Sequence, residues 1–145
     1  MNLIKSDNPI LVTKSTEVSE ADIDSVRGKY VEMTGLMYKL HGLGLAANQI
    51  GETKRYFVWD YGMVINPEIL MYEGKIIENR EGCLSYPGII KDVKRNNKIT
   101  VTYLDERGIK MNKVLVGVPA MIFQHEFDHL EGITLINKDD KPKES

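Results

Sequence analysis

Residues 119–132 read PAMIFQHEFDHLEG, and the fold is best understood outward from this stretch. Pro119 suits the first position of a helix, where its missing N–H does no harm. Gly132 is placed to end that helix, because glycine readily takes the left-handed backbone conformation found just past helix ends. We therefore predict a helix over Ala120–Leu130.

This helix contains His125-Glu126-Phe127-Asp128-His129, an H-E-x-x-H motif. Positions i and i+4 lie on one face of a helix, so both imidazoles can reach a single metal ion. Glu126 follows the first histidine, where its carboxylate can meet a metal-bound water without being a ligand itself. The alternative is a solvated helix with two incidental histidines, and the helical context that the motif requires argues against it.

Two histidines leave a third ligand to be found. A metzincin protease would carry another histidine six residues after His129, but Leu135 stands there. Cys83 is the only cysteine, and its thiolate would be a strong ligand for Fe²⁺ or Zn²⁺. One thiolate and two imidazoles leave a fourth position open for water, as in a catalytic site. Taken alone, such a cysteine is more often an ordinary buried residue.

The composition is that of one globular domain spanning residues 1–145, since domains average roughly 150 residues. Hydrophobic residues make up 42% and charged residues 28%. The net charge of −2 has no basic excess of the kind that nucleic-acid binders show. The single cysteine excludes an internal disulfide framework, and no apolar run is long enough to cross a bilayer. We expect a cytoplasmic protein that binds neither nucleic acid nor membrane.

The remaining pattern predicts an α+β fold, with antiparallel β-sheets packed around the H-E-x-x-H helix and one N-terminal helix. That N-terminal helix is expected from about Glu20 to His41, ended by Gly42, because apolar residues recur there at steps of four and three. Residues 1–18 are predicted to be an extended arm and residues 137–145 a polar tail. Short β-rich runs predict strands at Arg55–Asp60, Met63–Ile65, Ile69–Tyr72, Lys75–Glu78, Ile99–Leu104 and Ile109–Val116, the last two joined by a turn at Asp105–Gly108.

A third segment reads Gly42-Leu43-Gly44-Leu45-Ala46-Ala47-Asn48-Gln49. Its small residues leave the backbone accessible, although on spacing alone a helix end leading into a tightly packed strand is the preferred interpretation. Together with Glu81-Gly82-Cys83-Leu84-Ser85 and the H-E-x-x-H motif, this segment resembles the peptide deformylase family. The family's motifs G-x-G-L-A-A-x-Q, E-G-C-L-S and H-E-x-D-H occur here in the same order, and the resemblance extends from Ser19 to Ile136.

The resemblance implies a metal-dependent hydrolase that removes the formyl group from the N-terminal methionine of newly made polypeptides. One divalent ion, Fe²⁺ physiologically with Zn²⁺ or Ni²⁺ as substitutes, would be held by Cys83, His125 and His129. Glu126 would be the general acid–base that works with metal-bound hydroxide. Gln49 and the backbone N–H of Leu84 would polarise the formyl oxygen.

The resemblance also implies partners and supporting residues. N-formyl-methionyl peptides and nascent chains would be the substrates. The methionine side chain would enter a pocket lined by Leu43, Gly44, Val118, Met121 and Ile122, of which the last three suit plain core packing equally well. Glu81 or Asp128 would hold an imidazole N–H or pair with Arg95, and the alternative is that these acids lie on the surface.

The chain departs from the family pattern at three places. Asn48 stands where proline or threonine is common, and Ile90 where many members carry an arginine near the substrate chain. Bacterial members usually continue after H-E-x-D-H into a long C-terminal helix implicated in ribosome docking. No such helix follows in this sequence, so the resemblance is to a compact form and implies weakened ribosome association.

Two other functions fit parts of the pattern. A zinc peptidase that cleaves internal peptide bonds would need a third ligand downstream of His129 and would not depend on Cys83. A catalytically silent module that binds formyl-peptides, or that a metal merely stabilises, would usually have lost Glu126 or Gln49, and both are present.

Overall fold

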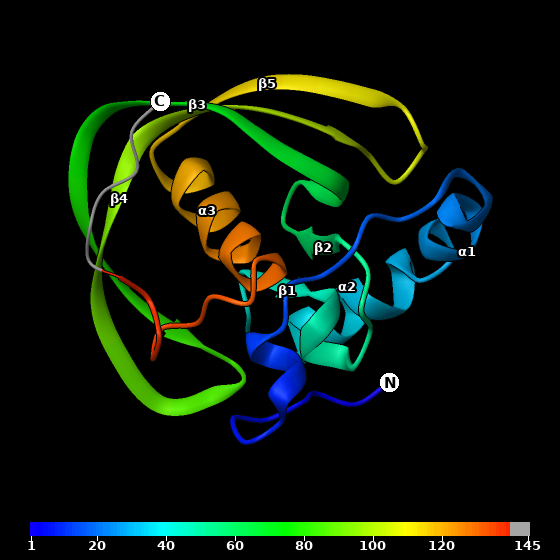
Figure 1. Cartoon of the computed structure of the whole chain (residues 1–145), viewed down its shortest axis with the longest axis horizontal. Coiled ribbons are helices and arrows are strands. Elements are labelled where there is room, and N and C mark those ends of the chain that lie inside the picture. The colour runs from blue at the N-terminus through cyan, green and yellow to red at the C-terminus, as the bar shows by residue number, and fades with distance from the viewer. Residues whose placement is uncertain (140–145) are drawn as a thin grey trace.

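In the computed structural model, residues 1–139 are described, and their strands form one antiparallel sheet that curls around a central helix (Figure 1). Each strand pairs with the next along the chain, in the order β1 (Gly44–Ala46), β2 (Tyr56–Trp59), β3 (Gly62–Cys83), β4 (Tyr86–Leu104) and β5 (Lys110–Val116). The central helix, α3 (Val118–Leu130), lies inside the curve of β3, β4 and β5. The predicted α+β fold, built around the H-E-x-x-H helix, is confirmed.

The end of α3 explains why glycine follows it. Gly132 takes a φ of 73°, and its N–H donates to the His129 carbonyl at 3.1 Å. The next N–H, from Ile133, reaches back to the Asp128 carbonyl at 2.8 Å, which completes a Schellman motif. A Cβ on Gly132 would also lie 2.8 Å from the backbone of Val12, so both conformation and space require glycine.

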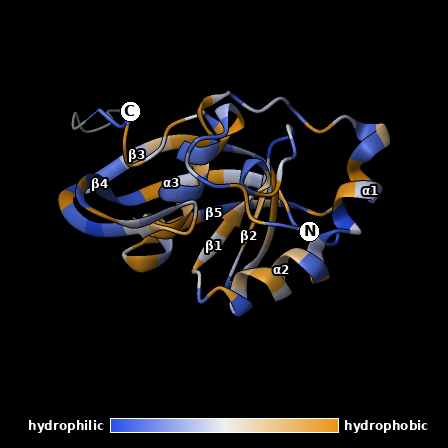
Figure 2. Ribbon diagram, turned by 90° about the horizontal axis from the view of Figure 1, so that it is seen from below, coloured by the Kyte–Doolittle hydropathy of each residue, from blue (hydrophilic) through white to orange (hydrophobic). Residues whose placement is uncertain are grey.

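Strands β1 and β2 and the first residues of β3 are apolar on both faces. Alternate residues such as Phe57, Trp59 and Val64 belong to the core against α3, while Val58 and Met63 belong to a second core. The second core packs against Met33 and Met37 of helix α2 (Tyr30–Lys39), both fully buried. Figure 2 shows the hydrophobic colouring of β1 and β2 beside α2. This arrangement places the β1–β2 edge of the sheet between two helices.

Aromatic rings fix α3 against this sheet. Phe123 on the helix is fully buried, and its ring centroid lies 5.3 Å from that of Phe57 and 5.6 Å from that of Trp59. Both pairs meet edge to face, a geometry worth about 0.5–1.5 kcal/mol beyond the area it buries. Since Phe123 lies just before His125, the same contact sets the position of the motif.

The strands predicted at Met63–Ile65, Ile69–Tyr72 and Lys75–Glu78 are parts of one long strand, β3, which pairs with β2 at its start and with β4 from Ile65 onward. The turn-forming residues between them are absorbed as irregularities in the pairing, where Asn66 takes a φ of 51° and Gly74 a φ of 71°. The Asn66 side chain is held by the backbone of Val18, to which it both donates and accepts. These bends allow one sheet to wrap around α3.

The predicted N-terminal helix is divided in two. A 3-10 turn (Glu20–Asp22) leads into α1 (Ile23–Arg27), and α2 begins only at Tyr30. The residues at the break are tied to different loops: Arg27 donates to the Glu106 carbonyl at 2.9 Å, and Lys29 pairs with Glu52. Such contacts between distant segments redirect a helix that local periodicity would continue.

The end of α2 also differs from the prediction. His41, and not Gly42, takes the left-handed conformation, with a φ of 60°. The Gly42 N–H then donates to the Met37 carbonyl at 2.9 Å. Gly42 is required for a different reason, because a Cβ there would lie 2.7 Å from Cδ1 of Leu84.

The N-terminal segment contains a 3-10 helix (Pro9–Val12) capped by Asn8, and Leu11 within it is fully buried. Ser15 N–H donates to the Leu130 carbonyl at 2.8 Å, which joins this segment to the end of α3. Of the predicted polar tail, residues 140–145 lie outside the described residues. None of the helices in residues 1–139 has the length and apolar composition needed to cross a membrane.

We predict that Gly132→Ala lowers the free energy of unfolding by at least about 2 kcal/mol, because it adds both left-handed strain and a clash with Val12. Gly35→Ala is the matched control, since Gly35 lies within α2 with no atom near its Cβ position. The control should stabilise the protein by up to about 1 kcal/mol. Urea denaturation measures both, and equal midpoints for the two variants would contradict the packing described here.

Candidate active site

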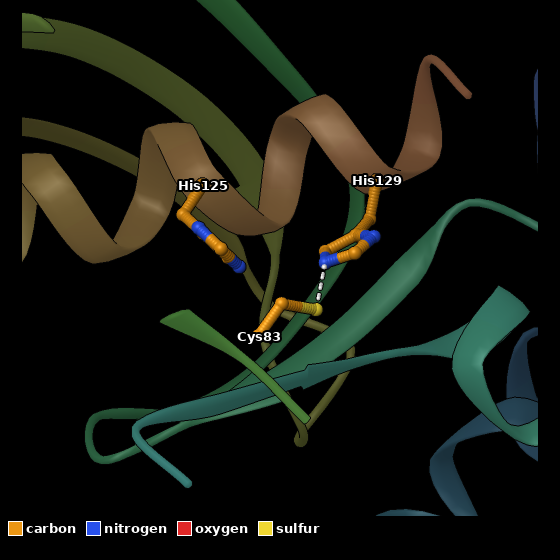
Figure 3. A group of neighbouring side chains, drawn as sticks. All are labelled: Cys83, His125 and His129. Atoms are coloured by element: carbon orange, nitrogen blue, oxygen red, sulfur yellow. Dashed lines mark hydrogen bonds between the residues drawn. The ribbon is translucent and has the colours of Figure 1, made fainter. Parts of the chain in front are cut away.

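Two segments that are distant in sequence meet at one end of the curled sheet. Cys83 is the last residue of β3, and His125 and His129 lie one turn apart on α3. Figure 3 shows both imidazole rings on the side of the helix that faces Cys83. The Cys83 Sγ lies 3.3 Å from Nε2 of His129, and one ligand atom from each of the three residues lies within 4.8 Å of the others. The structure therefore brings the three predicted metal ligands together.

A carboxylate orients the first histidine. Nδ1 of His125 lies 2.7 Å from Oε1 of Glu81, two residues before Cys83 on β3. With Nδ1 engaged by a carboxylate, the ring presents Nε2 as the atom that can bind a cation. Although burial lowers it, hydrogen bonds with Cys83 and Glu81 raise the pKa of His125 to about 10.

Glu81 is in turn held by Arg95 of β4. The guanidinium donates to both carboxylate oxygens, at 2.5 and 2.8 Å, and a further nitrogen donates to Asp128 at 2.9 Å. Burial alone would raise the pKa of Glu81, but the bonds from Arg95 and His125 bring it well below its usual range. Two arrangements were expected for these acids: a contact with an imidazole N–H and a pair with Arg95. Glu81 makes both contacts, whereas Asp128 pairs with Arg95 and does not contact the His125 imidazole.

Glu126 has a contrasting environment. Its side chain is 5% exposed, and its Oε1 is buried with no hydrogen-bond partner among residues 1–139. Its Oε2 lies 4.0 Å from Nε2 of His125. Burial raises the pKa of Glu126 to about 7, with the charge of His125 acting in the opposite direction. A carboxyl group with this pKa can both take and return a proton near neutral pH.

The Glu126 carboxyl group reaches this position because β1 begins with glycine. A Cβ on Gly44 would lie 2.5 Å from Oε2 of Glu126 and 2.7 Å from its Cδ. No side chain can therefore occupy that position unless the carboxyl group moves. Gly44 was predicted to line a substrate pocket, and its close contact with Glu126 is an additional constraint on the same residue.

His129 is the most deeply buried of the three predicted ligands. Burial and the neighbouring His125 keep the pKa of His129 well below its usual range, so its ring is neutral with a lone pair to offer. The backbone carbonyl of His129 accepts a bond of 2.7 Å from the side-chain amide of Asn48. Asn48, a departure from the family pattern, thus joins the segment before β2 to the end of α3.

Gln49 reaches the same centre from the 3-10 turn after β1 (Ala47–Ile50). Its Oε1 accepts the Ala46 N–H at 2.9 Å, while Nε2 donates to Ser85 Oγ at 3.1 Å and approaches Cys83 Sγ at 3.5 Å. The backbone carbonyl of Gln49 also accepts the N–H of Ile4 at 2.6 Å. The bonds of the side-chain amide with Ala46 and Ser85 orient its hydrogens towards Cys83. Ser85, which the sequence analysis did not single out, is fully buried.

The backbone N–H of Leu84 follows Cys83 in the two-residue connection between β3 and β4. Within the described part of the chain it donates to no acceptor. The Leu84 side chain packs against Gly42, where a Cβ would displace it. A free donor therefore lies beside the cysteine, and Gly42 provides the space that this conformation needs.

A cavity of about 580 Å³ opens beside these groups. It is lined by all five residues predicted for the methionine pocket, Leu43, Gly44, Val118, Met121 and Ile122, as well as by Cys83, His125 and Glu126. Met121 and Ile122 are buried, whereas Leu43 and Val118 are about two-thirds exposed and lie where the cavity meets solvent. Tyr86 and Ile90 also line it, and the sequence analysis did not assign either to a pocket.

The donor set fits a divalent transition-metal ion. One sulfur and two imidazole nitrogens are ligands that Zn²⁺ and Fe²⁺ both accept, and three protein ligands leave a position for water or substrate. The orphaned Oε1 of Glu126 is buried next to this group and needs a hydrogen-bond partner, which a water at the open position would provide.

The family model for polypeptide deformylases matches residues 1–145 of this sequence. This chain belongs to that family. The peptide deformylase of Thermotoga petrophila is 39% identical over 135 residues, which are 90% of this chain and 82% of that protein. The resemblance inferred from the three motifs is therefore confirmed, and the chain is an enzyme of the peptide deformylase class.

Solved structures of family members share this fold. The crystal structure of the Thermotoga maritima peptide deformylase has a TM-score of 0.89 at 36% identity, and the match covers 97% of each chain. The enzyme of the Vibrio parahaemolyticus bacteriophage VP16T, solved in complex with actinonin, has a TM-score of 0.85 at 36% identity. That match covers 93% of this chain and 100% of the phage chain.

We predict that Gly44→Ala displaces the Glu126 carboxyl group while leaving the three metal ligands in place, because the three atoms nearest to its added carbon all belong to the Glu126 side chain. Turnover should fall by about 10²-fold or more, the range for a misplaced general acid–base, with metal content unchanged. Elemental analysis and steady-state kinetics on the same preparation provide the measurement. Wild-type turnover in this variant would show that the carboxyl group has another position available.

Proposed function

We propose that this chain removes the formyl group from the N-terminal methionine of newly made polypeptides in the cytoplasm. The observation that carries the proposal is the convergence of Cys83 with His125 and His129, beside a buried Glu126, on a cavity open to solvent. Membership of the peptide deformylase family supports the same reaction. Weak association with the ribosome stays a prediction from the sequence.

Cys83, His125 and His129 would hold one divalent ion, Fe²⁺ in the cell with Zn²⁺ or Ni²⁺ as substitutes. When bound, such an ion lowers the pKa of a coordinated water from about 15.7 towards 7 and so supplies hydroxide at neutral pH. The support for this proposal is the donor set itself, and the bond between Glu81 and His125 that leaves Nε2 of the ring available.

Glu126 would move the proton. Its carboxyl group accepts a proton from the attacking water and delivers it to the amine that leaves when the formyl C–N bond breaks. Both transfers are feasible because its pKa of about 7 lies near the working pH. Its low exposure excludes bulk water from competing for the same proton.

Gln49 and Leu84 would stabilise the developing negative charge on the formyl oxygen. The Gln49 amide is fixed by Ala46 and Ser85, and the Leu84 N–H has no other acceptor in residues 1–139. Donors that are positioned before the reaction lower the barrier without a cost of reorganisation, and each is worth roughly 2.7–4 kcal/mol.

The methionine side chain would occupy the apolar part of the cavity, over Met121 and Ile122, with Leu43 and Val118 at its edge. Burial of an unbranched thioether against such a surface favours methionine over charged or polar residues. The small size of a formyl group, compared with acetyl, suits a centre in which Gly44 and Glu126 are already in contact.

We predict that protein loaded with metal without oxygen releases formate from formyl-Met-Ala, leaves acetyl-Met-Ala intact, and does not cleave a longer unformylated peptide. Glu126→Ala should keep its metal and lose about 10²–10⁴-fold in turnover, the contribution typical of a general acid–base. Cleavage of the unformylated peptide would favour an internal peptidase, and binding of formyl-Met-Ala without turnover would favour a silent module. Wild-type turnover in Glu126→Ala would disprove its assigned role.

We predict that Cys83→Ala does not retain metal through gel filtration, because two imidazoles alone remain. Ser85→Ala is the matched control: it removes a polar atom two residues away that contacts Gln49 and is not one of the ligands. The control should retain metal with reduced turnover. Atomic emission on both variants decides the matter, and full metal content in Cys83→Ala would remove sulfur from the ligand set.

A further inference from the structure

A chain of charged side chains runs from the first histidine to a lysine beyond the end of α3. His125 contacts Glu81, and Arg95 joins Glu81 to Asp128. Nζ of Lys138 then lies 2.8 Å from Oδ2 of Asp128, the same oxygen that accepts from Arg95 at 2.9 Å. Sequence reasoning placed Lys138 in a polar tail, so this contact was not expected.

The Lys138 side chain is only 9% exposed, although lysine is almost never fully buried without a partner. The side chains of Arg95, Glu81 and Asp128 are similarly shielded. The two carboxylates, of Glu81 and Asp128, are therefore shared among Arg95, Lys138 and the His125 ring. Among residues 1–139, removal of the ammonium group would leave Arg95 as the only cation in contact with Asp128, and a buried carboxylate that loses a charged partner is costly.

We propose that Lys138 is a positioning residue for His125 that acts through Asp128, Arg95 and Glu81. By holding Asp128, the ammonium group leaves Arg95 free to keep both of its paired bonds on Glu81. A carboxylate fixed by a two-point contact cannot rotate away from His125, so Nδ1 stays engaged and Nε2 faces Cys83. The proposal rests on the proposed function only in taking His125 as a metal ligand.

A purely structural role is the competing explanation. Lys138 lies eight residues after α3, and its contact with Asp128 joins this part of the chain to the helix. In that case, loss of the ammonium group would destabilise the fold and leave the affinity of the folded protein for metal unchanged. A positioning role predicts that the folded protein binds metal more weakly, whereas a purely structural role predicts unchanged affinity. The affinity for metal and the stability of the metal-free protein are therefore measured separately.

The test measures Zn²⁺ affinity by competition with a chromogenic chelator, together with the Co²⁺ absorption spectrum, which reports coordination by sulfur. Lys138→Met keeps an unbranched apolar side chain that is one atom shorter and removes the charge, and it should weaken Zn²⁺ binding by about tenfold, at the lower end for outer-shell changes. Lys138→Arg should stay within about twofold of wild type because the charge is restored. The control Lys98→Met removes an exposed surface pair with Glu73 and should change nothing.

A double variant tests the route of the effect. If Lys138 acts through Asp128, then Lys138→Met on an Asp128→Asn background should add less than about twofold to the loss of affinity, since contacting residues are non-additive. This comparison also serves if Lys138→Met alone does not fold. Equal losses on both backgrounds, or unchanged affinity with a lower unfolding midpoint of the metal-free protein, would overturn the proposal. Absence of Zn²⁺ binding by the wild type would instead refute the metal centre.

Discussion

This structure depends on the burial of a helix, α3, that carries polar as well as apolar side chains into the interior. Nine of the thirteen residues of α3 are buried, and these include Gln124, Glu126, Asp128 and His129. Polar groups removed from water need partners, because an unpaired buried group costs about 1–3 kcal/mol. The sheet that surrounds α3 supplies most of these partners, such as Arg95 for Asp128 and the Asn96 carbonyl for Gln124. Oε1 of Glu126, which has no partner within residues 1–139, lies at the centre where the reaction is proposed.

Two carboxylates of the same type serve opposite purposes in this site. Glu81 accepts bonds from Arg95 and His125 that bring its pKa well below the usual range, so it remains charged and orients a ring. Glu126 accepts no such bonds within residues 1–139, and burial raises its pKa to about 7. The chemical difference between a fixed anion and a proton carrier thus comes from hydrogen bonding, burial and the neighbouring charges, over the short distance between β3 and α3.

Residue patterns in the sequence predicted those helix ends and strands that depend on neighbouring residues alone. The limits of α3 follow from Pro119 and Gly132, and the run of aromatic and β-branched residues at Arg55–Asp60 predicted the strand that became β2. Local signals failed where distant contacts prevail: Arg27 and Lys29 are pulled to separate loops and divide the first helix, and bulges join three predicted strands into β3. The placement of Lys138 was missed for the same reason. The residues next to Lys138 in sequence do not indicate that it pairs with Asp128, ten residues earlier in the chain.

Strands β1 and β2 and the start of β3 are apolar on both faces, and this has a consequence for how the protein is made. Translation delivers these residues after α2, so the face that carries Val58 and Met63 is covered soon after it emerges. The opposite face, with Phe57 and Trp59, must wait for Phe123, which is synthesised only after β5. Until then a nascent chain displays bare aromatic surface, a hallmark of species that aggregate or recruit chaperones. Catalytic competence and protection from self-association therefore arrive together, with α3.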